Sequence, residues 1–262
     1  MEVLNLKYTH NTRDLGGMKT KDGKIIKHNQ LFRSGVLKKL SLEDIELLKS
    51  HNLKIVIDFR SEEEFITRPD IRIDGVTYLN FPALKPHNLP KSKPSNNTDN
   101  NLLQLVDKEN GGMKLLLNTY QELVTSKEGI TAYQNFFKTL INEEGAFLWH
   151  CSQGKDRAGL ASFFLEYALG VPFEDCVNDY LYTNIAMEKK IKQLTPLVLK
   201  MSNYDRSLLP ILKDVFEAKI EYLNKSLETI NNEYESLDNF LVNILKIDID
   251  KLKDKFLIDS IL

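Results

Sequence analysis

Residues 146–170 constrain the fold of this chain more than any other stretch of its sequence. A short apolar run, AFLWHC, leads into the polar decapeptide HCSQGKDRAG, which overlaps it at His150 and Cys151, and the apolar segment LASFFLEYALG follows. The first run has the length of a buried strand. The last segment has the length of a helix and meets the usual stop signals, Gly170 and then Pro172. The pattern predicts a strand, a tight loop and a helix in direct succession.

The flanking segments extend this unit into an alternating pattern. Ser41 is a suitable N-cap for a helix over 41–52, and strands are predicted at 54–59 and 76–81. Helical patterns cover 113–124 and 129–145, and most of the chain from 173 onwards. We therefore predict an α/β fold with a central, mostly parallel sheet flanked by helices, with extra C-terminal helices. No repeat and no clean boundary divides residues 1–262, which indicates one domain.

Residues from about 84 to 112 differ in composition from the rest of the chain. They are rich in Pro, Asn, Lys and Ser and poor in apolar side chains, as in LKPHNLPKSKPSNNTDNN. Structureless segments of this length are either functional or simple disordered inserts. We interpret this one as a lid or a flexible insert.

Bulk composition excludes several classes of protein. A net charge of −2 gives no general attraction to nucleic acid, and two cysteines suit a reducing compartment. The first residues lack a signal-peptide pattern, and no window is apolar enough to insert stably in a membrane. The expected location is the cytoplasm, with export by a route that needs no signal peptide left open. The histidines other than His150 are scattered, so we expect no metal and no cofactor.

The decapeptide predicts an anion site built around a thiol. A loop between a strand and a helix N-terminus points its backbone N–H groups at one place, where the helix dipole also favours negative charge. The same positive environment stabilises Cys151 as a thiolate nucleophile. Arg157, six positions later, offers a planar fork that can bind two phosphate oxygens. The residues expected to contact the phosphate are Ser152, Gln153, Gly154, Lys155 and Arg157.

The remaining side chains of the decapeptide fit phosphoryl transfer to sulfur. Gly154 allows a sharp turn towards the ligand, and Lys155 is expected to place a positive charge on the rim. A carboxylate beside a bound phosphate tends to hold its proton, so Asp156 is the candidate general acid. His150 is expected to hydrogen-bond the surrounding backbone and to tune the thiolate.

These residues resemble those of a known family. HCSQGKDRAG is similar to the phosphate loop of the protein tyrosine phosphatase superfamily, in particular of the atypical bacterial tyrosine and dual-specificity phosphatases. NTRDLGG at 11–17, LFRSG at 31–35, IDFRSEEE at 57–64 and YESLDNFL near the end resemble further segments of that family. The matched segments span nearly the whole chain.

The resemblance implies a metal-independent phosphatase that forms a phospho-cysteine intermediate and releases inorganic phosphate. Cys151 would be the nucleophile, Arg157 the phosphate ligand and Asp156 the general acid, while Lys155 would favour phosphate-rich substrates such as phosphoinositides. The implied partners are phosphotyrosine proteins, with phosphoserine, phosphothreonine and phosphoinositide substrates also considered. Asp58 is a second candidate for the general acid, and the alternative for Asp58 is a structural pair with a nearby arginine.

The sequence also gives predictions for Ala158 and Cys176, and it leaves two alternative functions open. Ala158 stands where many superfamily members carry Ser or Thr, which predicts slow hydrolysis of the phospho-cysteine. Cys176, in a helical pattern, is expected to be a buried small hydrophobe. One alternative to a phosphatase is a phosphate-binding module with weak turnover. The other is a rhodanese-like or arsenate-reducing enzyme, which also binds an anion around a thiolate.

Overall fold

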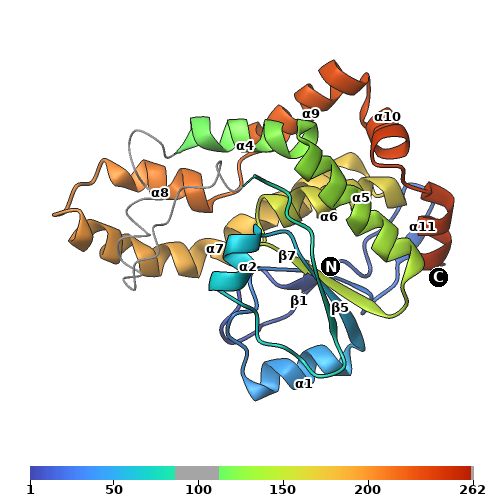
Figure 1. Ribbon diagram of the computed structural model, residues 1–262, viewed down its shortest axis with the longest axis horizontal. Coiled ribbons are helices and arrows are strands. Elements are labelled where there is room, and N and C mark those ends of the chain that lie inside the picture. Colours follow the sequence, from blue (N-terminus) through green and yellow to red (C-terminus); the bar gives the residue numbers. More distant parts are fainter. Residues whose placement is uncertain (86–111, 261–262) are drawn as a thin grey trace.

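The computed structural model describes residues 1–85 and 112–260, and its centre is a six-stranded sheet (Figure 1). The strands lie in the order β1-β2-β4-β7-β5-β6, with β4, β7, β5 and β6 mutually parallel and β1 and β2 antiparallel at one edge. Their bounds are β1 Glu2–Val3, β2 Arg13–Asp14, β4 Leu31–Ser34, β5 Leu53–Asp58, β6 Thr77–Asn80 and β7 Ala146–His150. Strands β3 (Lys24–Ile26) and β8 (Leu257–Asp259) form a separate antiparallel pair.

Helices make up most of the remaining described chain. Their bounds are α1 Leu42–Ser50, α2 Glu62–Thr67, α4 Met113–Thr125, α5 Lys127–Asn142, α6 Arg157–Leu169, α7 Phe173–Met201, α8 Leu208–Phe216, α9 Ile220–Tyr234, α10 Leu237–Asn239 and α11 Ile249–Phe256. A π-helical segment, Phe240–Ile244, follows α10. The predicted capping of α1 is confirmed, because the Ser41 side chain accepts from the backbone N–H of Asp44 and the Asp44 side chain accepts in return.

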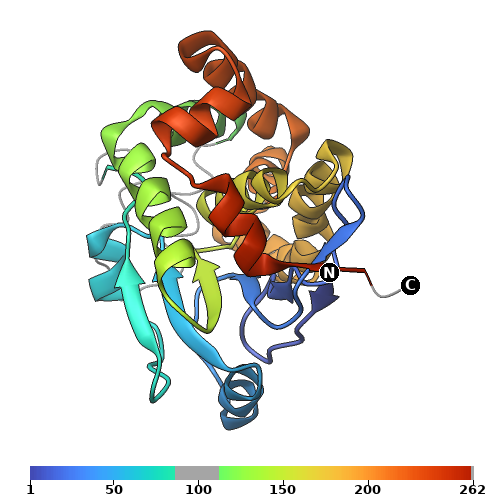
Figure 2. The ribbon, with the colours of Figure 1, turned by 90° about the vertical axis from the view of Figure 1, so that its right-hand side faces the viewer.

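Both faces of the sheet are covered by a hydrophobic core. Successive residues along the central strands point into one core and then into the other. Phe32, Val56 and Leu148 pack with Leu48 of α1 on one face. Their neighbours along the strands pack on the other face, among α5, α6 and the C-terminal helices. Figures 1 and 2 show α1 alone on its side and the larger helical layer opposite. Burial on both faces explains why the central strands β5 and β7 are mostly apolar rather than alternating with polar residues. The predicted fold class is confirmed.

The parallel strands bring the ends of three sequence segments to one edge of the sheet. Ser34, His150 and Asp58 are register partners at the carboxyl ends of β4, β7 and β5. The loop 151–157 starts directly after β7, and α6 runs from Arg157 to Leu169 with Gly170, whose φ is +91°, as its C-cap. The strand, loop and helix predicted from the sequence are therefore confirmed. In open α/β sheets, this carboxyl edge is where ligands bind.

The far end of α7 and helix α8 have a small core of their own. Met187, Val198, Leu208, Leu212 and Phe216 pack together there, apart from the two cores of the sheet. In Figure 1 the two helices extend side by side away from the sheet. The segment predicted as a lid or insert, about 84–112, lies outside the described residues except at its ends. Within the described chain, no helix combines the length and the apolar character needed to cross a membrane.

Candidate active site

The loop 151–157 is tightly folded against the end of strand β4. Gly154 has a φ of +67°, and a Cβ atom there would lie 2.4 Å from the carbonyl oxygen of Ser34. A glycine is therefore required for both reasons, backbone conformation and close approach. Gly159 is also closely packed, because a Cβ atom at this position would lie 2.8 Å from Arg33 Nη2. Cys151, the first loop residue, is 2% exposed and is not part of a disulfide.

Side chains behind the loop bind its carbonyl oxygens. Asn11 Nδ2 donates to the carbonyls of Gln153 (3.2 Å) and Gly154 (3.0 Å). Arg33 Nε donates to the carbonyl of Gly154 at 2.8 Å, and Arg33 Nη2 to that of Lys155 at 3.2 Å. These contacts bind the carbonyl oxygens of the loop, so its N–H groups are the candidates for binding an anion.

Asp179 of α7 anchors these supporting side chains. It accepts a two-point contact from Arg13 (2.7 and 3.0 Å) and a third bond from Arg33 Nη1 (2.9 Å). Burial opposes its charge, but Arg13 and Arg33 outweigh it and lower the pKa of Asp179 to about 2. Thus the matched segments 11–17 and 31–35 act by holding the loop, which the sequence alone did not reveal.

Arg157 is held by a carboxylate that the sequence analysis did not single out. Its Nη1 donates to Glu64 Oε2 at 2.7 Å, and its Nη2 to Ser152 Oγ at 3.2 Å. The Ser152 hydroxyl in turn donates to Glu64 Oε1. Burial raises the pKa of Glu64, but Arg157 and the donors around it lower that pKa from 4.5 to about 2. This pair therefore contributes stability above pH 4.5 that is lost as the pH falls towards 2.

The position of Glu64 follows from a local signal in the sequence. Ser61 caps α2, and Glu64 is the third residue of a capping box, in which its side chain accepts from the backbone N–H of Ser61 at 3.1 Å. The pattern S-x-x-E just after strand β5 could have identified this carboxylate as one held in a defined place near the carboxyl edge.

We expect Glu64→Gln to lower kcat by about tenfold while KM for para-nitrophenyl phosphate stays level or falls. The neutral amide no longer orients the guanidinium for the transition state, yet it also removes a negative charge that competes with the substrate for Arg157. Steady-state kinetics separate the two constants. Glu63→Gln, an exposed residue on the same helix, is the matched control. Equal kinetics for the two variants would contradict a role in positioning Arg157.

Asp156 lies at the N-terminus of α6, with one oxygen held by two partners. Its Oδ1 accepts from the Tyr120 hydroxyl at 2.8 Å and lies 3.3 Å from Lys155 Nζ, and its side chain is 20% exposed. Burial and the neighbouring carboxylate raise the pKa of Tyr120 well above its ordinary value, so this hydroxyl remains a donor. The carboxyl is thus fixed and partly accessible five residues after the thiol, and its role as the general acid stays a prediction.

Asp58 has a different environment, which matches the structural alternative considered for it. Both of its oxygens accept from Arg60, at 2.7–3.0 Å, and its side chain is 2% exposed. Asp70 lies 3.1 Å from the same guanidinium and 3.0 Å from His150 Nε2. Although burial disfavours a charged imidazole, Asp58 and Asp70 raise the pKa of His150. The geometry places Asp58 in an ion-pair cluster beneath the loop.

Asp58, Asp70 and His150 also bring their ligand-type atoms within 4.8 Å of one another. The residues do not fit a metal ion, because Arg60 already occupies the space between the two carboxylates and supplies the positive charge. His150 Nδ1 lies 3.2 Å from the carbonyl oxygen of Cys151. The cluster therefore supports the start of the loop, in line with the backbone contact expected for His150.

The expected placement of Lys155 on the rim is wrong. Its side chain is fully buried, and its ammonium donates to the carbonyls of Val215 (2.7 Å), in the last turn of α8, and of Glu217 (3.2 Å), the C-cap of that helix. It also lies 5.5 Å from the ring centroid of Tyr222. The direction of this side chain depends on helices more than 50 residues away, which loop spacing alone does not indicate. Lys155 thus gives no direct argument for phosphate-rich substrates.

Cys176 is buried in α7, as expected for a small hydrophobe. Burial raises the pKa of its thiol, and its Sγ lies 3.7 Å from the carbonyl of Val171. Ala158 is also fully buried, and its carbonyl accepts from Ser162 Oγ at 3.0 Å. No hydroxyl is present at position 158, so the contrast with Ser or Thr at this place holds in the structure.

These contacts define a class of site. A thiol starts a loop whose carbonyl oxygens are bound by Asn11 and Arg33, and a guanidinium oriented by Glu64 ends it. Such a site binds a tetrahedral oxyanion against a sulfur nucleophile.

Comparison with known proteins gives the family. Residues 4–258 match the sequence model of the tyrosine phosphatase family. The chain belongs to the tyrosine phosphatase family, whose members are phosphoric monoester hydrolases. The resemblance drawn from the loop is thereby confirmed, and the rhodanese-like and arsenate-reducing alternatives are set aside.

Individual relatives agree with this assignment. A candidate tyrosine-protein phosphatase of Cupriavidus necator is 28% identical over 250 residues, which cover 94% of this chain and 85% of the relative. The triple specificity protein phosphatase PtpB of Mycobacterium tuberculosis is 25% identical over 265 residues, covering 92% and 93%. The crystal structure of Pseudomonas aeruginosa TpbA with phosphotyrosine matches at a TM-score of 0.30 and 14% identity, covering 69% and 91%. The last match is too distant to support an argument.

Proposed function

We propose that this chain hydrolyses phosphate monoesters by way of a phospho-cysteine, with phosphotyrosine as the leading substrate. The observation that carries the proposal is the geometry of the loop: Cys151 and Arg157 bound its two ends, and Glu64 fixes the guanidinium. The names of the two relatives, a tyrosine-protein phosphatase and a triple specificity phosphatase, support activity on phosphorylated proteins. Phosphoserine, phosphothreonine and phosphoinositides are the further substrates to be compared.

The proposed reaction has two steps. In the first, the Cys151 thiolate attacks phosphorus, the bond from phosphorus to the leaving oxygen breaks, and Asp156 gives that oxygen its proton. In the second, water attacks the phospho-cysteine, Asp156 accepts a proton from the water, and the thiolate leaves inorganic phosphate behind. Arg157 and the loop N–H groups bind the phosphoryl oxygens in both steps. None of the steps requires a metal or a cofactor.

We also propose a domain organisation and a cellular location for this chain. Residues 1–262 are proposed to act as one phosphatase domain, since the supports of the loop come from positions as far apart as Asn11 and Asp179. Both cysteines are unpaired and buried, which suits a reducing compartment and supports a cytoplasmic location.

A phosphate-binding module with weak turnover is the other candidate, and Ala158 is the observation that favours it. Hydrolysis of para-nitrophenyl phosphate in excess chelator tests the main proposal, and rapid-quench kinetics separate the two candidates. We expect a burst of para-nitrophenol equal to the enzyme concentration, followed by a slower steady rate, because position 158 offers no hydroxyl to help the thiolate leave. A linear trace at saturating substrate would contradict slow dephosphorylation, and a burst without later turnover would favour the binding module.

A further inference from the structure

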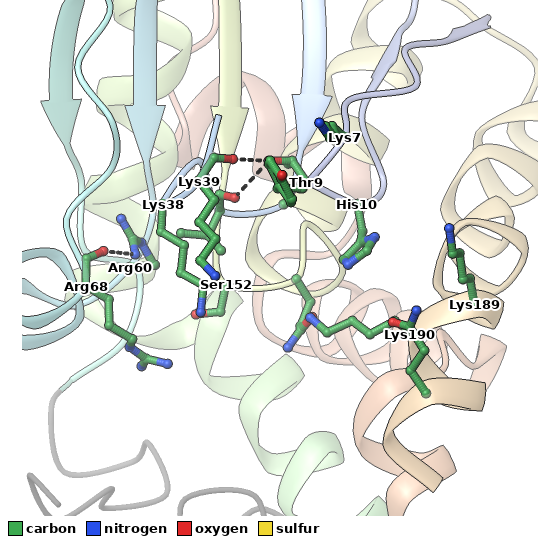
Figure 3. Close-up of a pocket in the computed structure, with 15 residues that line it drawn as sticks. Lys7, Thr9, His10, Lys38, Lys39, Arg60, Arg68, Ser152, Lys189 and Lys190 are labelled. Carbon is green, nitrogen blue, oxygen red and sulfur yellow. Dashed lines mark hydrogen bonds between the residues drawn. The ribbon is translucent and has the colours of Figure 1, made fainter. Parts of the chain in front are cut away.

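A cavity of about 460 Å³ lies beside the loop 151–157, and its walls are unusually rich in positive charge. Figure 3 shows it below the carboxyl ends of the strands. We call it the basic pocket and define it by Lys38, Lys39, Arg68, Lys189, Lys190 and His10. The pocket reaches the loop at Ser152 and Gln153, one and two residues beyond the thiol. Its volume falls in the range of small-molecule sites.

The cations of the basic pocket come from separate parts of the fold. Lys38 and Lys39 lie between β4 and α1, Arg68 caps the end of α2, and Lys189 and Lys190 belong to α7. No aspartate or glutamate is among the described residues that line the cavity. Among the ion pairs between described residues, none involves Lys38, Lys39 or Lys189, while Arg68 reaches Glu64 at 3.7 Å. The positive charges are therefore largely uncompensated within the pocket.

Burial, and then neighbouring positive charges, lower the pKa values of three members, Lys190, His10 and Lys38. Burial, and then Lys38, lower the pKa of Lys190 to about 8. Burial, Lys190 and Lys189 lower the pKa of His10. Like charges held together in a cavity are unfavourable, and a bound anion removes that penalty.

The basic pocket is linked directly to the catalytic loop. Lys190 Nζ donates to the side-chain oxygen of Gln153 at 2.6 Å, and in Figure 3 the side chains of Lys38 and Lys39 lie beside Ser152. An anionic group bound here would lie next to a phosphate bound at Cys151 and Arg157. A single ligand that carries both groups would then occupy both places.

We propose that the basic pocket is a second anion site, which binds an additional phosphate group of a small substrate whose first phosphate occupies the loop. The proposal rests on the proposed function and names the substrate class, small molecules with two or more phosphates. A small molecule fits the observations better than a peptide, because the cations gather around one cavity of about 460 Å³, a volume in the range of small-molecule sites. Lys38, Lys39 and Lys189 then determine specificity, and Lys190 adds a contact that also touches the loop.

The test measures binding without turnover, so that it does not depend on the catalytic proposal. Calorimetry on the Cys151→Ser protein compares inorganic phosphate with a series of alkane bisphosphonates of increasing chain length. We expect one chain length to bind about 100-fold more tightly than phosphate, because two charge-assisted contacts of about tenfold each are added. Failure of the catalytic proposal would appear separately, as a wild-type protein without phosphatase activity.

Variants assign the effect to the basic pocket. Lys39→Gln with Lys189→Gln is expected to remove about tenfold or more of the bisphosphonate preference. The matched control, Lys49→Gln with Lys192→Gln, removes the same charge from exposed positions of α1 and α7 outside the pocket and is expected to preserve that preference. The proposal is overturned if every bisphosphonate binds no better than phosphate, or if both double variants lose the preference equally. Tighter binding only of phosphotyrosine peptides with acidic neighbours would also overturn it, in favour of a peptide site.

Discussion

We expect Cys151→Ser to lower turnover of para-nitrophenyl phosphate and of phosphotyrosine peptides by at least about 10⁴-fold. A serine hydroxyl in the same loop is a far weaker nucleophile than a thiolate, while the loop N–H groups and Arg157 remain to bind phosphate. The variant is therefore expected to bind a phosphotyrosine peptide with nearly wild-type affinity. Initial rates in excess chelator and calorimetric titration measure the two quantities.

Two further variants separate chemistry from folding. Arg157→Lys keeps a positive charge but loses the planar fork that pairs with Glu64 and with two phosphoryl oxygens, so we expect a fall of about 10³-fold in kcat/KM. Cys176→Ser is the matched control for the thiol, because its side chain lies in α7 against a backbone carbonyl. We expect Cys176→Ser to retain activity. Retained activity in Cys151→Ser would refute the phospho-cysteine mechanism.

Asp156→Asn is expected to lower kcat about 10³-fold on phenyl phosphate but only about tenfold on para-nitrophenyl phosphate. Phenoxide is a poor leaving group and needs a proton in the transition state, whereas para-nitrophenoxide leaves without much help. A set of aryl phosphates with different leaving groups measures this as a steeper dependence of kcat on the leaving-group pKa. The structure motivates the prediction, since the Asp156 carboxyl is fixed by Tyr120 and partly accessible.

Asp58→Asn provides the comparison that assigns the acid. Its carboxylate is buried against Arg60 and near His150, so its replacement should lower the free energy of unfolding by about 3 kcal/mol or more. Any loss of activity should be the same for good and poor leaving groups. If instead Asp58→Asn steepens the leaving-group dependence and Asp156→Asn does not, the roles of the two aspartates are reversed.

The parts of the molecule that the sequence predicted are those governed by local patterns. Strand β7, the loop and helix α6 follow one another within 25 residues, and apolar runs, Gly154 and Gly170 suffice to place them. The paired alternative for Asp58 could also be stated in advance, because Arg60 lies only two residues away. The candidate residues Cys151, Asp156 and Arg157 lie within a single loop and its junction with α6.

The remaining contacts depend on tertiary packing and had no local signal. The buried direction of Lys155 is set by carbonyls at the C-terminal end of α8. The use of Asp179 as an anchor requires α7 to reach strands β2 and β4. The basic pocket likewise joins segments that are separate in sequence. The spacing of residues within one motif gives no information on contacts between segments that are distant in the sequence.

The supports behind the loop have a consequence for the order of folding. Asn11 and Arg33 reach the carbonyl of Gly154 across 143 and 121 residues of sequence. Closing such long separations is entropically costly and slow, so these bonds belong to the late part of folding. We therefore expect the loop that holds Cys151 to reach its final shape only when the two halves of the chain have joined. A measurement of phosphate binding would therefore detect only chains that have folded completely.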